Sequence, residues 1–282
     1  MLQTVQKIGP VLDLFTVQRP DWGVTQVAEA IGLPRSSAHA LLASLVETGL
    51  LRCQPRGRYR LGWRVVELNE TLRGSIDLQA VASAVLQRLV DQHGETVHLA
   101  VMQHGRVLYL DKLPGTRQLT VAGARVGTQL EAHCSAVGKV LLAYCHAQEL
   151  QRFLAGAPLR RLTPATKTDP LLLRAELDTI RASGIGFDEC ETVGEVSCVA
   201  APIRDDSGVV VAALSLTAPS GRLRSRRNEY RRSVKAAALE ISHRLDGDTS
   251  PRLNVVHDGP AVATSLAPSD DAPTALRALS SG

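Results

Sequence analysis

The segment 25–62 constrains the fold more than any other part of the chain. Its pattern predicts two short helices, a tight turn between them and an arginine-rich hairpin after them. Thr25 suits a helix N-cap, and Gly32 suits the end of that helix. Pro34 lies at the first turn of the next helix, where proline is tolerated. This order of elements predicts a winged helix-turn-helix.

The second helix of this segment separates an apolar face from a polar end. Its apolar side chains recur at helical spacing and are Ala38, Leu41, Leu42 and Leu45. The N-terminal end carries short polar or basic side chains, which are Arg35, Ser36, Ser37 and His39. The major groove of DNA accepts such residues at that end of a recognition helix. We therefore expect them to contact DNA.

The hairpin that follows forms a basic wing. The run 50–64 contains no Asp or Glu and carries arginines throughout, so it would neutralise phosphates. Residues 54–57 supply the turn, and Arg56, Arg58 and Arg60 are the wing residues that we expect to hold the DNA backbone or probe the minor groove. A solvated charged hairpin on a protein–protein module is the alternative. DNA binding is favoured because the helix pair and the basic wing occur together in the right order.

Composition limits the class of protein. A chain of 282 residues with 44% apolar content can form two ordinary domains, and a net charge of +4 requires any nucleic-acid surface to be local. No apolar run is long enough to span a bilayer, and the N-terminus lacks a signal-peptide core. The 5 cysteines form no Cys-x-x-Cys pair, which argues against a zinc ribbon and a disulfide framework. We expect a cytoplasmic protein without cofactor or membrane partner.

The rest of the chain alternates between helical and strand-like patterns, which favours an α+β fold. We expect strands over 96–102, 106–113, 198–203 and 209–217, with hairpins at His104-Gly105 and at Asp205 to Gly208. The expected helices are 5–15, 78–93, 135–144, 148–154, 170–183 and 225–245. An antiparallel sheet flanked by helices is typical of a sensor domain with a pocket over the sheet.

These patterns divide the chain into segments with different roles. We assign 1–62 to the winged helix-turn-helix, 63–77 to a linker helix and 78–246 to the second domain. The segment 247–282 is rich in Ser, Pro, Ala and Asp, which predicts a disordered tail.

Several motifs in both domains resemble those of one family. In chain order they are GLPRSSAHALLASLVETGLL, GRYRLG, GETVHLAV, HCSAVGKVLLA, RLTPATKTDP and CVAAPIRDDSGVVVAALSLTAPSGRL. In order and spacing they resemble the IclR-type transcription regulators. The resemblance implies a winged helix joined to a GAF-like effector domain, a homodimer or homotetramer, and a palindromic operator. It also implies an effector that is a small organic acid or aromatic metabolite.

An effector pocket follows partly from the residues and partly from the resemblance. The turn into the helix at Ser135 to Gly138 leaves free N–H groups, so we expect a carboxylate near Ala136 and Val137. The resemblance implies polar effector contacts from Asp188, Cys198, Ser215 and Thr217, and apolar walls from Leu119, Ala122 and Leu130. Ser215 and Thr217 lie two apart on a strand and face the same side. Small residues that only fill a half-buried sheet are the alternative.

Catalysis and metal binding are weaker interpretations. His133, Cys134 and Ser135 are adjacent, but neighbours along a chain rarely aim at one another, and no Gly-x-Ser-x-Gly motif is present. Lys139 could brace the fold rather than activate Ser135. His133, Cys134, Cys145 and His146 cluster only suggestively, and we expect no metal. The basic cluster 222–232 is expected to be a solvated face with partners elsewhere on the surface.

The sequence therefore predicts a ligand-responsive DNA-binding regulator that acts as a repressor. A small-molecule-sensing protein–protein interaction module is the runner-up, and an enzyme that uses the C-terminal pocket is third.

Overall fold

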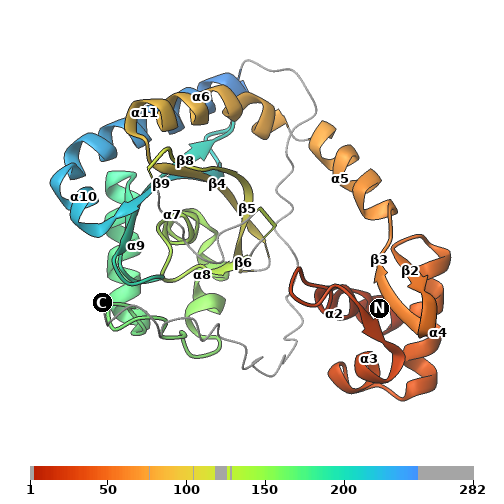
Figure 1. Cartoon of the computed structure of the whole chain (residues 1–282). Helices are drawn as coiled ribbons and strands as arrows, with labels where there is room; N and C mark the ends of the chain where they lie inside the picture. Colours follow the sequence, from red (N-terminus) through yellow and green to blue (C-terminus); the bar gives the residue numbers. More distant parts are fainter. Residues whose placement is uncertain (1–2, 76, 104, 118–125, 128, 247–282) are drawn as a thin grey trace, which may run out of the picture. The chain divides into compact units, whose positions relative to one another are not determined.

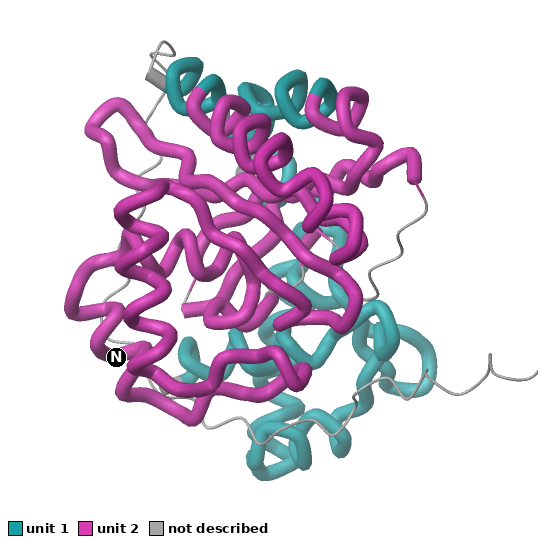
Figure 2. Tube along the Cα trace, turned by 90° about the vertical axis from the view of Figure 1, so that its left-hand side faces the viewer, with its two compact units in different colours: residues 1–88, 240–251 teal, residues 89–239, 252–282 magenta. Residues whose placement is uncertain are grey.

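The computed structural model describes residues 3–75, 77–103, 105–117, 126–127 and 129–246. The chain divides into two compact units, residues 1–88 with 240–251 and residues 89–239 with 252–282 (Figure 2). The domain boundaries given above remain predictions, and the predicted tail lies outside the described residues. No described helix is both long and apolar enough to cross a membrane.

The first unit contains the predicted winged helix-turn-helix. Its helices are α1 Gln3–Gln6, α2 Ile8–Asp13, α3 Val24–Ala30 and α4 Arg35–Glu47. Its strands are β1 Trp22–Gly23, β2 Leu51–Gln54 and β3 Arg58–Leu61, in an antiparallel sheet of order β1-β3-β2. A short 3-10 turn, Pro55–Gly57, joins β2 to β3 at the tip of the wing. Val11, Val27, Leu42 and Leu45 form the centre of the core beneath these elements.

The start of α3 differs from the prediction. The N-cap is Gly23 rather than Thr25, because the Gly23 N–H donates to Oε1 of Gln26 at 3.1 Å and the helix begins at Val24. A side chain three residues inside the helix thus satisfies a backbone group at its start. Pro34 is itself the N-cap of α4, one position before the first turn. Gly32 has a φ of 65°, which lets the chain leave α3 toward α4 without strain.

Two helices follow the wing. These are α5, Arg64–Ser75, and α6, Asp77–His93, and residue 76 between them is outside the described residues. The Arg88 guanidinium of α6 donates to both carboxylate oxygens of Glu240, at 2.6 Å each. Glu240 belongs to α11, Arg227–Asp246, the last described helix.

The second unit is built on a six-stranded antiparallel sheet of order β6-β5-β4-β9-β8-β7. Its strands are β4 Thr96–Gln103, β5 Arg106–Leu113, β6 Gln129–Glu131, β7 Gly186–Glu189, β8 Val196–Arg204 and β9 Val210–Pro219. The longer strands and both hairpins confirm the prediction, whereas β6 and β7 were not predicted. The remaining helices are α7 Ala136–Tyr144, α8 Ala147–Leu154, α9 Pro170–Ser183 and α10 Ser220–Ser225. The predicted final helix 225–245 corresponds to α11, which begins at Arg227, whereas the short helix α10 before it was not predicted.

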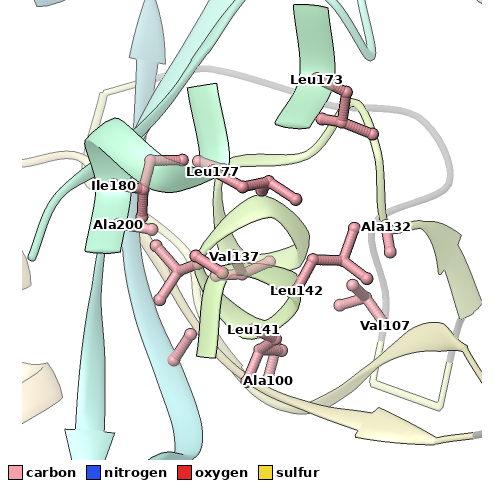
Figure 3. Packing of buried hydrophobic residues seen from close by; sticks show 14 of the residues in the cluster. Ala100, Val107, Ala132, Val137, Leu141, Leu142, Leu173, Leu177, Ile180 and Ala200 are labelled. Atoms are coloured by element: carbon pink, nitrogen blue, oxygen red, sulfur yellow. The ribbon is translucent and has the colours of Figure 1, made fainter. Parts of the chain in front are cut away.

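Helix α7 lies inside the curve of this sheet (Figure 1) and is almost entirely buried. Val137, Leu141 and Leu142 pack against side chains of the sheet and of α9 (Figure 3). The helix can approach closely because the facing residues are small. At Gly186, for example, an added Cβ would lie 2.8 Å from Cγ2 of Val140. This close packing fixes the N-terminus of α7 over the sheet, where the candidate pocket lies.

Candidate functional site

Helix α4 has the two faces that the sequence predicts. Ala38, Leu41, Leu42 and Leu45 are buried. Arg35, Ser36, Ser37 and His39 are exposed together at the N-terminal end. The structure thus brings the predicted α4 residues into one exposed surface, which can present hydrogen-bond donors and a positive charge to a nucleic acid.

The predicted wing arginines have different environments. Arg56 occupies the tip of the wing, is exposed and has a φ of 65°. Its guanidinium has no hydrogen-bond or ion-pair partner within the described part of the chain. Of the three predicted wing arginines, Arg56 is therefore the one whose guanidinium is free of described partners and can contact a phosphate.

Arg58 and Arg60 are instead held by Asp21. Nε of Arg58 donates to Oδ1 of Asp21 at 2.7 Å, and a terminal nitrogen of Arg60 lies 3.2 Å from Oδ2. Arg58 also donates to Oε1 of Gln26 at 2.7 Å. The hydrogen bond from Arg58, followed by that from Arg60, keeps the pKa of Asp21 below its ordinary value. The run 50–64 contains no acidic residue, but Asp21, from outside this run, pairs with both arginines.

The other arginines of the wing also have structural contacts. The guanidinium of Arg52 lies 4.9 Å from the centre of the Trp63 ring, in a cation–π contact. Arg64 donates to the carbonyl oxygen of Thr48 at 3.3 Å, where α4 ends. Several arginines of the wing thus have structural contacts, whereas the guanidinium of Arg56 has none in the described part of the chain.

The second unit contains a pocket of about 520 Å³, including its open mouth. Those predicted effector residues that the structure describes all line it, namely Leu130, Ala136, Val137, Asp188, Cys198, Ser215 and Thr217. Leu119 and Ala122, the other predicted wall residues, lie outside the described residues. The sequence did not identify the remaining lining residues, which are His98, Tyr109, Ser135, Thr192, Val193 and Val196.

A row of polar side chains crosses the sheet beneath this pocket. Strand register pairs Asp188 of β7 with Cys198 of β8, and Cys198 with Thr217 of β9. Sγ of Cys198 lies 3.2 Å from Oγ1 of Thr217, which in turn lies 3.3 Å from Nδ1 of His98 on β4. The His98 ring stacks on Tyr109, with a centroid distance of 4.5 Å. We call Asp188, Cys198, Thr217 and His98 the polar row.

Burial controls the charges in the polar row. Desolvation raises the pKa of Asp188 to about 6, although the backbone N–H of Glu191 donates to its Oδ1 at 2.7 Å and opposes the shift. Desolvation also lowers the pKa of His98 to about 3, so this imidazole is neutral at pH 7. Burial raises the pKa of the Cys198 thiol, which therefore stays protonated. At pH 7 the polar row thus carries one negative charge, on Asp188.

The N-terminus of α7 faces the same pocket. Oγ of Ser135 caps the helix by accepting the N–H of Gly138 at 3.2 Å. The N–H groups of Ala136 and Val137, both on lining residues, have no hydrogen-bond partner within the described ranges. Unpaired N–H groups and the helix dipole together favour an anion at this point.

The side chains considered for catalysis have structural roles. Oγ of Ser135 donates to the carbonyl oxygen of Glu131 at 3.2 Å, in addition to capping α7. Nε2 of His133 lies 2.9 Å from the carbonyl oxygen of Arg160. Lys139 is fully buried and donates to Glu176 at 2.7 Å and to Glu191, which confirms that it braces the fold. Within the described ranges, no group of three or more His, Cys, Asp or Glu residues could hold a metal ion.

Three of the six arginines in the basic cluster at 222–232 are paired with acidic residues in the described part of the chain. Arg222 contacts the buried carboxylate of Glu95, and Arg227 contacts Glu189. Arg226 donates to Glu229 one turn further along the helix. This surface therefore offers less positive charge than its sequence suggests.

Comparison with known proteins gives consistent matches over both units. Residues 71–243 match the family model for the bacterial transcriptional regulator IclR C-terminal domain, and residues 4–55 match the IclR helix-turn-helix domain. The HTH-type transcriptional regulator XynR of Escherichia coli is 32% identical over 87% of this chain and 98% of its own length. The transcriptional repressor IclR of Escherichia coli is 29% identical over 78% of this chain and 81% of its own length.

One solved structure is similar to most of this chain. It is that of an IclR homologue complexed with 4-hydroxybenzoate from Microbacterium hydrocarbonoxydans. The two share 30% sequence identity with a TM-score of 0.75, over 87% of this chain and 100% of that one.

Proposed function

We propose that this chain, which belongs to the IclR family of bacterial transcriptional regulators, represses transcription from a palindromic operator and releases or tightens that repression when a small carboxylate binds its second unit. A DNA-binding helix-turn-helix regulator is what the family membership establishes, and the named relatives are regulators rather than enzymes. The operator symmetry, the direction of regulation, the effector and the residues involved are proposals. We further propose that the protein works in the cytoplasm, where its DNA partner is found.

The DNA-binding proposal rests on two features of the first unit, the exposed polar N-terminal end of α4 and the arginine at the tip of the wing that has no described partner. In this proposal Arg35, Ser36, Ser37 and His39 enter the major groove, and Arg56 reaches a phosphate or the minor groove. Arg58 and Arg60 contribute positive potential while Asp21 fixes their position. The wing then presents one exposed arginine without a described partner at its tip, while its neighbours are held by Asp21.

A homodimer or homotetramer is proposed because a palindrome needs two recognition helices. Two such helices reach half-sites about one helical turn apart, or a multiple of it. The start of α5 supports this, because Val66 is 53% exposed and lies one turn after Trp63, which is 70% exposed and directly precedes the helix. Exposed apolar side chains on one helix are typical of an interface with another chain. We propose a second copy of this chain as the partner.

The effector is proposed to be a small carboxylate in the pocket of the second unit. Its carboxylate would accept hydrogen bonds from the N–H groups of Ala136 and Val137. Leu130 would line the apolar wall, and Asp188, Cys198, Ser215 and Thr217 would supply polar contacts. The carboxylate ligand in the structure of the Microbacterium hydrocarbonoxydans relative supports this class of ligand.

A DNA-binding titration tests the main proposal. The full chain is titrated with the DNA upstream of its own gene at two salt concentrations, together with Arg35→Ala and Arg56→Ala variants. Each variant should bind the specific site less tightly by about 1–3 kcal/mol or reduce the slope of log K against log salt by about one. Arg174→Ala is the matched control, because Arg174 is an exposed arginine of α9 in the other unit. Binding that is insensitive to salt, or Arg35→Ala behaving like Arg174→Ala, would contradict the proposal and favour a protein-interaction module.

A glycine insertion tests how the effector acts. One extra residue within α5 turns everything that follows by about 100° relative to what precedes it. We expect the variant to keep effector binding and to lose the effect of the ligand on DNA binding. A variant that kept the full response would show that coupling does not pass through this helix.

A further inference from the structure

The carboxylate of Asp21 holds two arginines of the wing at once. Its Oδ1 accepts a hydrogen bond from Nε of Arg58 at 2.7 Å, and its Oδ2 lies 3.2 Å from a terminal nitrogen of Arg60. The two arginines lie two residues apart on β3 and share one face of this strand, whereas Tyr59 between them is buried. One acidic side chain from outside the wing thus pairs with both arginines on that face.

Arg58 has little capacity left for a further acceptor. One of its terminal nitrogens donates to the carbonyl oxygen of Asp21 at 3.0 Å, and the other donates to Oε1 of Gln26 at 2.7 Å. The same Gln26 oxygen accepts the N–H of Gly23 at 3.1 Å, which fixes it at the start of α3. All three guanidinium nitrogens of Arg58 therefore have acceptors in the protein. A phosphate that bound this guanidinium through two N–H groups would have to displace one of them.

The pair of Asp21 and Arg58 is also partly shielded from water. The two side chains are 28% and 38% exposed. Salt screens partly buried pairs less than it screens fully exposed ones. The wing thus offers the charge of Arg56 to a phosphate without loss, but it offers that of Arg58 only when contacts with Asp21 or Gln26 are broken.

This arrangement affects two kinds of DNA binding differently. Non-specific binding depends almost entirely on neutralised phosphates, so a carboxylate that holds two arginines weakens it. Specific binding also needs contacts with base edges, which we have proposed for the N-terminal end of α4. A guanidinium that is already fixed loses little side-chain freedom when one geometry of the complex forms, and this offsets part of its reduced charge. The expected result is a larger ratio of specific to non-specific affinity.

We propose that Asp21 is a specificity-determining residue for DNA binding, which keeps Arg58 and Arg60 from the phosphates of any sequence and leaves discrimination to α4. The inference rests on the proposed DNA contacts of the wing and of α4. A carboxylate that only braced the wing would act in the opposite direction, because its removal would weaken non-specific binding or leave it unchanged. The sign of the change therefore separates the two roles.

Asp21→Asn measures this sign. The full chain is titrated with a random-sequence duplex and with the duplex that the wild-type chain selects from a random pool. At about 0.1 M salt the non-specific affinity should rise by up to about eightfold, because one more neutralised phosphate changes the slope of log K against log salt by about 0.9. The affinity for the selected duplex should rise by less than about threefold, because the released arginines must be ordered again in that complex.

Two control variants separate the released arginines from the change in net charge. Asp13→Asn makes the same chemical change at an exposed residue of α2 that has no partner among the described residues. It should change the non-specific affinity by less than about twofold, because salt screens a single exposed charge. In an Arg58→Gln/Arg60→Gln chain, the further change Asp21→Asn should also have an effect below about twofold, because no arginine is left to release.

A measurement on the wild-type chain does not depend on the variants folding. When the random-sequence duplex is added, the NMR signal of Nε of Arg58 should shift less than that of Arg56, because Arg58 keeps Asp21 as its acceptor. An Arg58 signal that moves as far as that of Arg56 would overturn the role of Asp21.

The titrations distinguish failure of this inference from failure of the proposed function. Non-specific affinity that does not rise in Asp21→Asn, an equal rise in Asp13→Asn, or an unchanged ratio of specific to non-specific affinity would overturn the inference alone. If the wild-type chain selected no sequence from the pool, the proposed operator would be overturned and this inference with it.

Discussion

Replacing the buried carboxyl of the pocket should make the protein more stable at neutral pH. Asp188 is 3% exposed, and burial raises its pKa from an ordinary value of 3.8 to about 6. Below about pH 4 the carboxyl is protonated in both the folded and the unfolded chain. Between about pH 4 and pH 6 the folded chain keeps a proton that the unfolded chain releases, so stability falls as pH rises. Above about pH 6 both are ionised, and the folded chain carries the full cost of the buried charge.

The size of the effect follows from the shift of the pKa. A change from 3.8 to about 6 corresponds to about 3 kcal/mol at most, of which about 2 kcal/mol develops between pH 4.5 and pH 7.5. Asn in place of Asp188 keeps an oxygen to accept the N–H of Glu191 but has no proton to lose. Relative to wild type, Asp188→Asn should therefore gain about 2 kcal/mol of stability over that pH range.

Urea unfolding at the two pH values measures this gain. Circular dichroism follows the whole chain, whereas fluorescence follows only the first unit, because the two tryptophans, Trp22 and Trp63, both lie there. The gain should appear in the circular dichroism transition and be absent from the fluorescence transition. Equal pH dependence of Asp188→Asn and wild type would show that the buried carboxyl does not titrate as the geometry implies.

Three further changes test other parts of the structure. Lys139→Met should lower the stability of the second unit by up to about 3 kcal/mol, because it leaves the buried Glu191 with only the partly exposed Lys167, 3.7 Å away, as a cation, and adding Glu191→Gln should recover part of the loss in urea unfolding. Gly138→Ala should lower the melting temperature, because its Cβ would lie 2.4 Å from the carbonyl oxygen of Ala132, and an unchanged value would refute this close approach. Asp21→Asn should steepen the salt dependence of non-specific DNA binding by up to about one in slope, because it removes the negative charge that pairs with Arg58 and Arg60 of the wing. A shallower slope would count against the wing as a phosphate contact.

The sequence predicted most of the fold because the signals involved are local. The hairpins at His104-Gly105 and at Asp205 to Gly208 lie between strand-like runs and were found from a few residues each. The strands β6 and β7 were missed, because β6 has 3 residues and β7 has 4, and their pairing partners define them more than their own composition does. The order of the strands in the sheet likewise depends on contacts that no local pattern contains.

The site residues that the sequence analysis missed were also missed because their contacts join positions far apart in the chain. Arg58 meets Asp21 across 37 positions of the chain, so a scan of the wing alone could not find the pairing. His98 meets Thr217 across 119 positions. Most of β4 is buried on both faces, so no alternation along the strand showed which side chains enter the pocket. The signal that could have drawn attention to His98 was a histidine within an otherwise apolar strand.

The pocket combines several groups that the folded chain leaves incompletely satisfied. The charge on Asp188 is buried, Nε2 of His98 has no described partner, and the N–H groups of Ala136 and Val137, on residues that line the pocket, have no described partner either. Each lowers the stability of the free protein, and a ligand that hydrogen-bonds to any of them recovers part of that free energy. A ligand that satisfies them together favours only the arrangement in which α7 and the polar row stand in this geometry. Such differential binding is what a switch requires, since a tenfold change in DNA affinity needs about 1.4 kcal/mol of preference between two states.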